Sequence, residues 1–198
     1  YQNKPLNDFL STGNISFFDN YKIESIYSLP EFIDFISPFF SEQYNKRLSA
    51  YFEKWNIGNT TKILSVSPLV NTEYIDRSYN NVRVFIRSII DEIKNLRERI
   101  ENDVELINSD SFNNVYSLIT KSINPKLLNL LPHAQFQSLR NTLGNTIQYL
   151  AVIVHNIEYD KLDNDKTKNL THCFHIIEVA KEIDCTGLEE KKVRDNYY

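Results

Sequence analysis

Hydrophobic residues recur at intervals of three and four along much of the chain, which is the spacing typical of amphipathic α-helices. The clearest stretch lies near residues 73–107, where the apolar positions follow one another in steps of 4, 3, 4, 3 and 4. They are Val82, Ile86, Ile89, Ile93, Leu96 and Ile100. The pattern predicts one long helix, either the seam of a dimerising coiled coil or the spine of an intramolecular bundle. Phe85 and Ile90 widen the apolar stripe, which favours the bundle.

Proline, glycine and capping residues predict where the other helices begin and end. Pro30 suits the first turn of a helix that Pro38 should kink or split, and Gly58 should end the helix over 41–55. Ser109 and Asn124 are good N-caps for short helices near 111–123 and 125–131. Longer apolar patterns predict helices near 133–159 and 166–184.

The remaining segments read as irregular. Residues 1–28 combine turn formers with many aromatic residues, and residues 61–72 read as an extended connector. We therefore predict an all-α bundle of five to seven helices, with one long helix at about 73–107 and an irregular, aromatic-rich N-terminal segment. The expected organisation is one domain: an aromatic-rich segment with short helices (1–60), the connector (61–72), the bundle (73–187) and a charged tail (188–198).

Composition limits the classes of function. The 198 residues are 41% hydrophobic and 24% charged, as in ordinary globular chains, and no apolar run is long enough to span a membrane. The net charge of −4 argues against a broad nucleic-acid footprint, although a small local one fits. The two cysteines, Cys173 and Cys185, are typical of a reducing, intracellular compartment. Because the chain starts at Tyr1 and contains no methionine, we expect it to be part of a larger protein.

A short string near the start of the helix over 133–159 carries the first chemical lead. Arg140 is followed by Asn141 and, after three more residues, by Asn145. The string resembles the signature of the HEPN superfamily of metal-independent ribonucleases, in which an arginine and a polar residue precede a histidine. The resemblance implies RNA cleavage, with the arginine stabilising the charge on the reacting phosphate and the histidine moving protons. Here Asn145 stands where the histidine is expected, and asparagine exchanges no proton near neutral pH. Outside such a site, Arg140 is expected to face solvent.

The second lead is a histidine pair. His172 and His175 are three residues apart, so they share one face of a helix and are candidates for a metal site. Zinc needs four ligands, or three and a water, and Cys173 points away from the pair while Cys185 lies beyond the helix. The alternative interpretation is two histidines on a polar or boundary face.

No glycine-rich phosphate loop or nucleophile elbow occurs in the sequence, so no cofactor is predicted. We therefore expect a non-catalytic helical module that binds another protein or a second copy of itself. Its candidate interaction residues are the seam positions Ile86, Ile89, Ile93 and Leu96, together with Trp55. A HEPN-like RNA-cleaving or RNA-binding domain that uses Arg140, Asn141 and Asn145 is the first alternative. A metal-binding helical protein is the second.

Overall fold

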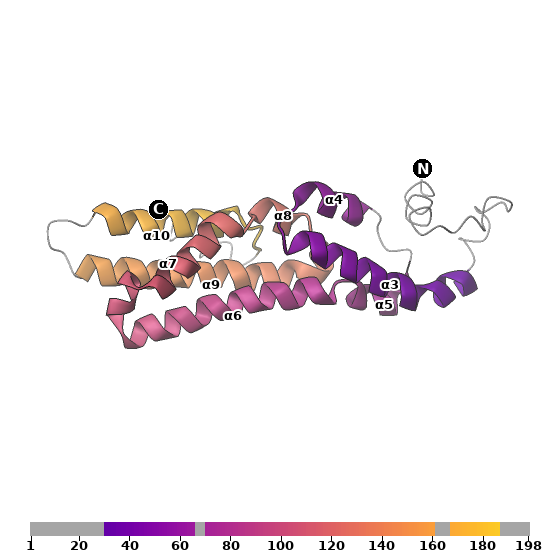
Figure 1. Ribbon diagram of the computed structural model, residues 1–198, viewed down its shortest axis with the longest axis horizontal. Coiled ribbons are helices and arrows are strands. Elements are labelled where there is room, and N and C mark those ends of the chain that lie inside the picture. The colour runs from indigo at the N-terminus through magenta and orange to yellow at the C-terminus, as the bar shows by residue number, and fades with distance from the viewer. Residues whose placement is uncertain (1–29, 66–69, 161–166, 187–198) are drawn as a thin grey trace. The chain divides into compact units, whose positions relative to one another are not determined.

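The computed structural model describes residues 30–65, 70–160 and 167–186, and these residues form helices and turns without a β-strand (Figure 1). The predicted all-α class is therefore confirmed. The helices are α3 (Pro30–Phe52), α4 (Ile57–Ser65), α5 (Thr72–Ser78), α6 (Asn80–Asn102), α7 (Asp110–Ser117), α8 (Pro125–Asn129), α9 (His133–Asp160) and α10 (Thr167–Glu182), with a 3₁₀ turn η2 (Val104–Asn108) and a π-helical turn η3 (Leu118–Ser122). Within the described ranges, no helix has the length and apolar character that crossing a membrane requires. The segment predicted over 1–28 and the tail over 188–198 lie outside the described residues.

The chain divides into two compact units, Tyr1–Val82 and Arg83–Tyr198. In the described part of the first unit, α3 packs on α4 and α5. Helix α3 begins at Pro30 as predicted, but it continues through Pro38 without the predicted split. A proline inside a helix removes one backbone hydrogen bond. Burial of the apolar face of α3 offsets that loss, and this face consists of Phe40, Tyr44, Leu48 and Phe52.

The extended connector predicted over residues 61–72 is helical in its first five residues, because α4 reaches Ser65. Trp55 follows α3 with a positive φ of 52°, which turns the chain out of the helix. The side-chain Oδ1 of Asn56 then accepts a hydrogen bond from the Asn59 N–H at 3.1 Å. Gly58, predicted to end the preceding helix, lies in the first turn of α4 instead. Local capping therefore starts a second helix that the sequence pattern did not indicate.

The single long helix predicted over 73–107 is interrupted at Tyr79, which separates α5 from α6. The ring of Tyr79 is buried and packs edge-on against Tyr44, with ring centroids 5.7 Å apart. The Oδ1 of Asn45 accepts a hydrogen bond from the Asn81 N–H at 2.9 Å and so caps the first turn of α6. These contacts with α3 cause the break, and they partly explain why the described residues contain eight α-helices rather than five to seven.

In the second unit, α6, α9 and α10 lie side by side (Figure 1). The helix predicted over 133–159 is confirmed as α9. Helix α10 runs antiparallel to α9, and the thiol of Cys173 on α10 lies 3.2 Å from the carbonyl oxygen of Ala151 on α9. Helix α6 packs along another side of α9, where the Arg83 guanidinium lies 5.7 Å from the centre of the Phe136 ring. The sites described below all belong to this unit.

The two predicted N-caps in this unit are confirmed. The hydroxyl of Ser109 accepts a hydrogen bond from the Phe112 N–H at 3.3 Å, and the side chain of Asn124 accepts one from the Leu127 N–H at 3.2 Å. The helix predicted near 111–123 forms as α7 followed by the π-helical turn η3. Cap residues were reliable here because they stabilise a helix end through local contacts alone.

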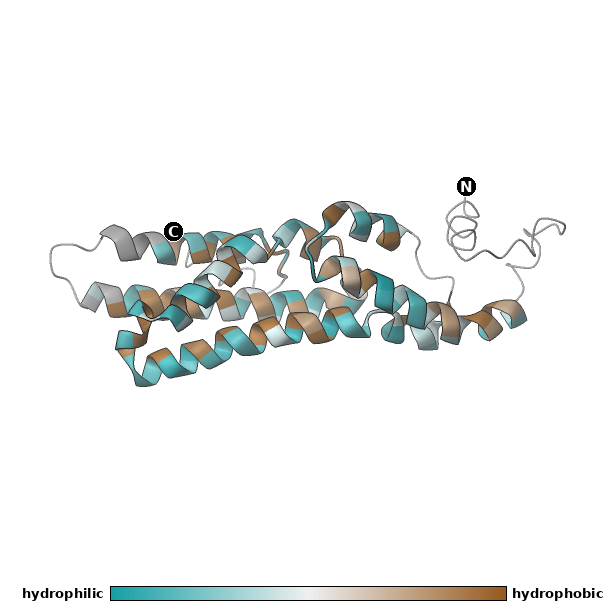
Figure 2. Ribbon diagram, viewed as in Figure 1, coloured by the Kyte–Doolittle hydropathy of each residue, from teal (hydrophilic) through white to brown (hydrophobic). Residues whose placement is uncertain are grey.

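The seam residues predicted as an interaction surface form the core of the protein itself. Their exposed fractions lie between 0 and 3%. They are Ile86, Ile89, Ile93 and Leu96. Figure 2 shows hydrophobic and hydrophilic residues alternating along α6. The structure therefore corrects this part of the interaction prediction, because side chains buried within one chain present no surface to a second molecule.

Candidate functional site

Arg140 is buried inside the second unit, with 2% of its surface exposed, and does not face solvent as expected. Its Nη1 donates hydrogen bonds to the carbonyl oxygens of Leu128 and Leu131, at 3.2 and 3.0 Å. Its Nη2 donates to Oε1 of Gln137 at 2.7 Å. The carbonyl groups at the end of a helix have no partner within that helix. The guanidinium therefore caps the C-terminal end of α8 and joins it to α9.

The charge of Arg140 is partly compensated by Asp184, whose carboxylate lies 4.0 Å from Nη2. Burial lowers the pKa of Arg140 below its ordinary value, and the nearby Asp184 carboxylate opposes this shift. An arginine keeps its proton at neutral pH even when its pKa is lowered. Arg140 is therefore a charged structural residue whose donors point into the protein, away from any ligand at the surface.

Asn141 and Gln137 hold the segment that follows α10. The Oδ1 of Asn141 accepts a hydrogen bond from the Thr186 N–H at 3.0 Å and another from Nε2 of Gln137 at 2.8 Å. The same Nε2 lies 2.9 Å from the carbonyl oxygen of Asp184. Asn129 adds two further bonds, donating to the Glu182 carbonyl and accepting from the Asp184 N–H, both at 2.9 Å. These contacts bind residues 182–186 to α8 and α9.

Gly144 allows this segment to approach closely. A Cβ atom at Gly144 would lie only 2.6 Å from the sulfur of Cys185, a distance that real contacts do not show. The Cys185 thiol is buried and lies 3.7 Å from the carbonyl oxygen of Arg140. The glycine in α9 is therefore a packing feature. Within the described residues, neither Cys173 nor Cys185 forms a disulfide bond.

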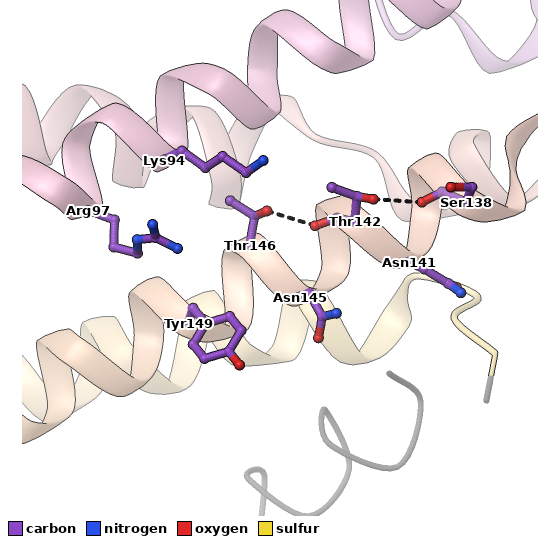
Figure 3. A pocket seen from close by; sticks show the side chains of 8 residues that line it. All are labelled: Lys94, Arg97, Ser138, Asn141, Thr142, Asn145, Thr146 and Tyr149. Atoms are coloured by element: carbon purple, nitrogen blue, oxygen red, sulfur yellow. Dashed lines mark hydrogen bonds between the residues drawn. The ribbon is translucent and has the colours of Figure 1, made fainter. Parts of the chain in front are cut away.

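A polar groove of about 550 Å³ lies between α6 and α9 (Figure 3). Lys94 and Arg97 extend from α6 toward α9. The α9 wall of the groove is built from hydroxyl and amide groups, namely Ser138, Asn141, Thr142, Asn145, Thr146 and Tyr149. Among the described residues that line it there is no carboxylate, histidine or cysteine. The groove thus combines two cations with neutral polar groups.

The side chains of the groove differ in what they can still bind. Thr142 and Thr146 donate their hydroxyl protons to helix carbonyl oxygens one turn back, at 2.8 and 2.7 Å, so their oxygens remain as acceptors. The Oδ1 of Asn145 is buried and receives no hydrogen bond from the described residues. Arg97 lies within 3.5 Å of Glu98 and 4.0 Å of Glu101. Both carboxylates are more than half exposed, and such pairs are weak enough for an incoming anion to replace.

The two histidines proposed as metal ligands are engaged with Tyr116. Nδ1 of His175 lies 2.8 Å from the Tyr116 hydroxyl oxygen, and the His172 ring lies 4.5 Å from the Tyr116 ring. Burial raises the pKa of Tyr116, so the phenol stays protonated at neutral pH, and the tautomer of His175 decides which of the two groups donates the hydrogen bond. No group of three or more potential ligands occurs among the described residues. The alternative of a metal site is therefore not supported by the positions of these side chains.

Of the three residues of the HEPN-like string, Asn141 and Asn145 line the groove, whereas Arg140 turns into the core. Trp55 belongs to the first unit, where it is partly buried and packs on Phe52 with ring centroids 5.2 Å apart. Sequence reasoning missed Lys94 and Arg97 as site residues. Both lie on the charged face of α6, where nothing in the sequence distinguishes them from their neighbours.

Comparisons with models of protein families, with curated proteins and with solved structures find no match to this chain.

Proposed function

We propose that this chain is a non-catalytic helical binding module and that the groove between α6 and α9 receives an anionic group of its partner. The observation that carries the proposal is the pairing of Lys94 and Arg97 across from a wall of hydroxyl and amide groups, with no carboxylate among the described residues of the lining. Two cations beside neutral donors and acceptors favour phosphate or carboxylate oxygens over neutral ligands.

The position of Arg140 favours binding over cleavage. The mechanism that the HEPN resemblance implies needs an arginine at the reacting phosphate, but the donors of Arg140 are used by Leu128, Leu131 and Gln137. The residue in the place of the expected histidine, Asn145, cannot transfer protons. The resemblance therefore gives no support to RNA cleavage here. Asn145 remains part of the wall of a binding groove, whereas the side chain of Asn141 is already bonded to Gln137 and Thr186.

The test uses tripolyphosphate as a small anionic probe, with binding to the full chain measured by isothermal titration calorimetry at low salt. We expect the double variant Lys94→Gln/Arg97→Gln to weaken binding at least tenfold, since each lost charge-assisted hydrogen bond costs about 1.5–3 kcal/mol. The matched control is Arg87→Gln/Arg99→Gln, which removes the same charge from exposed positions of the same helix outside the groove.

If both double variants weaken binding equally, the protein attracts anions through its general charge and the groove is not the site. If the parent chain does not bind tripolyphosphate, the proposal is wrong. Circular dichroism of each variant checks that the helices are retained.

A further inference from the structure

A second charged surface of the same unit is opposite in sign to the groove. Glu178 and Glu182 lie one turn apart on α10, and both side chains are exposed. They border a cavity of about 510 Å³, which the buried residues Ile123 and Pro125 also line. Residues four apart on a helix present their side chains on one face, with about 5–6 Å between Cβ atoms. Glu178 and Glu182, called the acidic pair below, therefore place two negative charges close together.

The acidic pair differs from the other carboxylate pairs at this kind of spacing. Among the described residues, neither of its side chains takes part in an ion pair or a hydrogen bond. In every other pair three or four residues apart on one described α-helix, at least one carboxylate has a partner; these pairs are Glu31–Asp34, Glu73–Asp76 and Glu98–Glu101. The acidic pair is therefore the one whose charges remain available to a cation from outside the described chain.

The groove between α6 and α9 supplies matching cations. Lys94 and Arg97 are three residues apart on α6 and extend toward α9 (Figure 3), so the spacing of their charges resembles that of the acidic pair. The neighbours of the two surfaces are complementary as well. Lys121 lines the cavity beside the acidic pair, while the exposed carboxylates of Glu98 and Glu101 lie next to Arg97. Each surface thus carries the charges that the other lacks.

We infer that the partner of the groove is a second copy of this chain, whose acidic pair binds Lys94 and Arg97. The inference rests on the proposed anion-binding function of the groove and names the anion that the groove receives. The contact joins two unlike surfaces, so each copy offers its groove to one neighbour and its acidic pair to another. Contacts of this kind form closed rings, of which a dimer is the smallest, or open chains. Because the pairs are exposed, salt weakens the association.

The experiment measures self-association of the full chain by sedimentation-velocity ultracentrifugation over a range of protein concentrations. We expect assemblies larger than one chain at low salt and their loss at about 0.5 M salt, which screens exposed charges. Lys94→Glu/Arg97→Glu should weaken association at least tenfold, because it brings like charges together at the contact. The matched control is Arg87→Glu/Arg99→Glu, which reverses two charges at exposed positions of the same helix outside the groove.

Reversal of the acidic pair tests the other side of the contact. Glu178→Lys/Glu182→Lys should also weaken association at least tenfold. Its control is Glu53→Lys/Glu92→Lys, which reverses two exposed carboxylates outside both surfaces. Circular dichroism checks that each variant keeps its helices. Since Glu178 and Glu182 are exposed, this variant and its control still decide the question if the reversal at the groove reduces stability.

Mixing the two reversed variants distinguishes a specific contact from a general effect of charge. Each variant alone has a groove and an acidic pair of the same sign, so each should be monomeric. In the mixture, the reversed groove meets the reversed acidic pair and the native groove meets the native one. Association should therefore return to within about threefold of the affinity of the parent chain, since the complementary charges are restored.

Three results would overturn the inference: a parent chain that is monomeric at its highest soluble concentration, controls that weaken association as much as the reversed variants do, and a mixture that does not associate. The tripolyphosphate titration separates these failures from failure of the proposed function. Glu178→Lys/Glu182→Lys keeps the groove and should bind tripolyphosphate as the parent does. If tripolyphosphate binds through Lys94 and Arg97 but the chain does not self-associate, the groove receives an anion from another molecule and only the inference fails.

Discussion

Replacement of Arg140 by alanine tests whether this residue stabilises the second unit. The guanidinium donates to two backbone carbonyls, of Leu128 and Leu131, and to the side chain of Gln137. The Leu131 carbonyl loses this donor, which costs about 1–3 kcal/mol, whereas the Leu128 carbonyl keeps the Leu131 N–H at 3.1 Å. The cavity left by a large buried side chain adds to this cost. The variant is also relieved of the cost of burying a charge. We therefore expect a net loss of about 3 kcal/mol, which is a large part of the ~5–15 kcal/mol that stabilises a typical domain.

Urea unfolding followed by far-UV circular dichroism measures this loss, and hydrogen exchange locates it. Exchange should accelerate first at the backbone amides of Asp184 and Thr186, because the segment that they belong to is bound through the network around Arg140. Arg140→Lys keeps the charge but lacks the planar guanidinium group, so its single ammonium group cannot bond both carbonyls and Gln137 in the same geometry. This variant should therefore lose less stability than Arg140→Ala. Arg87→Ala, at an exposed position of α6, is the surface control. Ordinary surface substitutions change the free energy of unfolding by no more than about 0.5 kcal/mol. If Arg140→Ala changes it by no more than this, the structural role assigned to Arg140 is wrong.

Other predictions concern the packing of the same unit. Gly144→Ala should lower the free energy of unfolding in urea by about 1–3 kcal/mol despite the better helix propensity of alanine, because the new Cβ meets the sulfur of Cys185. Adding Cys185→Ala should restore most of this loss. If stability does not recover, the close approach of Cys185 to Gly144 is not the cause of the loss. Gly58→Ala in the first unit, where the nearest atom to a new Cβ is 3.9 Å away, should not destabilise the protein and serves as the glycine control. Ile93→Asp should abolish the unfolding transition, since an unpaired charge in the core costs several kcal/mol; a folded monomer would instead identify α6 as an oligomer interface. Asn124→Ala should cost about 1 kcal/mol through loss of the α8 cap, and an unchanged melting temperature would refute that role.

Several features of the fold could be read from the sequence because they depend on local chemistry. The start of α3 at Pro30 and the caps at Ser109 and Asn124 each follow from one or two side chains acting on their own turn. The apolar stripe of α6 was equally clear, since its period of three and four residues persists through three heptads. The break at Tyr79 was not predictable, because it depends on Tyr44 and Asn45 from another helix.

The candidate site was predicted only in part. The string that contains Asn141 and Asn145 drew attention to the right side of α9, but the resemblance assigned a catalytic role to Arg140 that its burial does not support. Lys94 and Arg97 could not be chosen from the sequence, because α6 carries charged residues on every turn of its polar face. Which of them line the groove is decided by the packing of α6 on α9.

The sequence by itself determined the all-α class, the positions of most helices and the apolar face of α6. These features follow from the period of hydrophobic residues and from side chains that act within one turn. Only the tertiary structure decided which polar residues are buried and which remain available. Arg140 and Lys94 are both cations on helices, yet one caps α8 in the core and the other lines a groove. Periodicity alone cannot separate them, because burial of a polar side chain depends on hydrogen-bond partners supplied by segments distant in the chain.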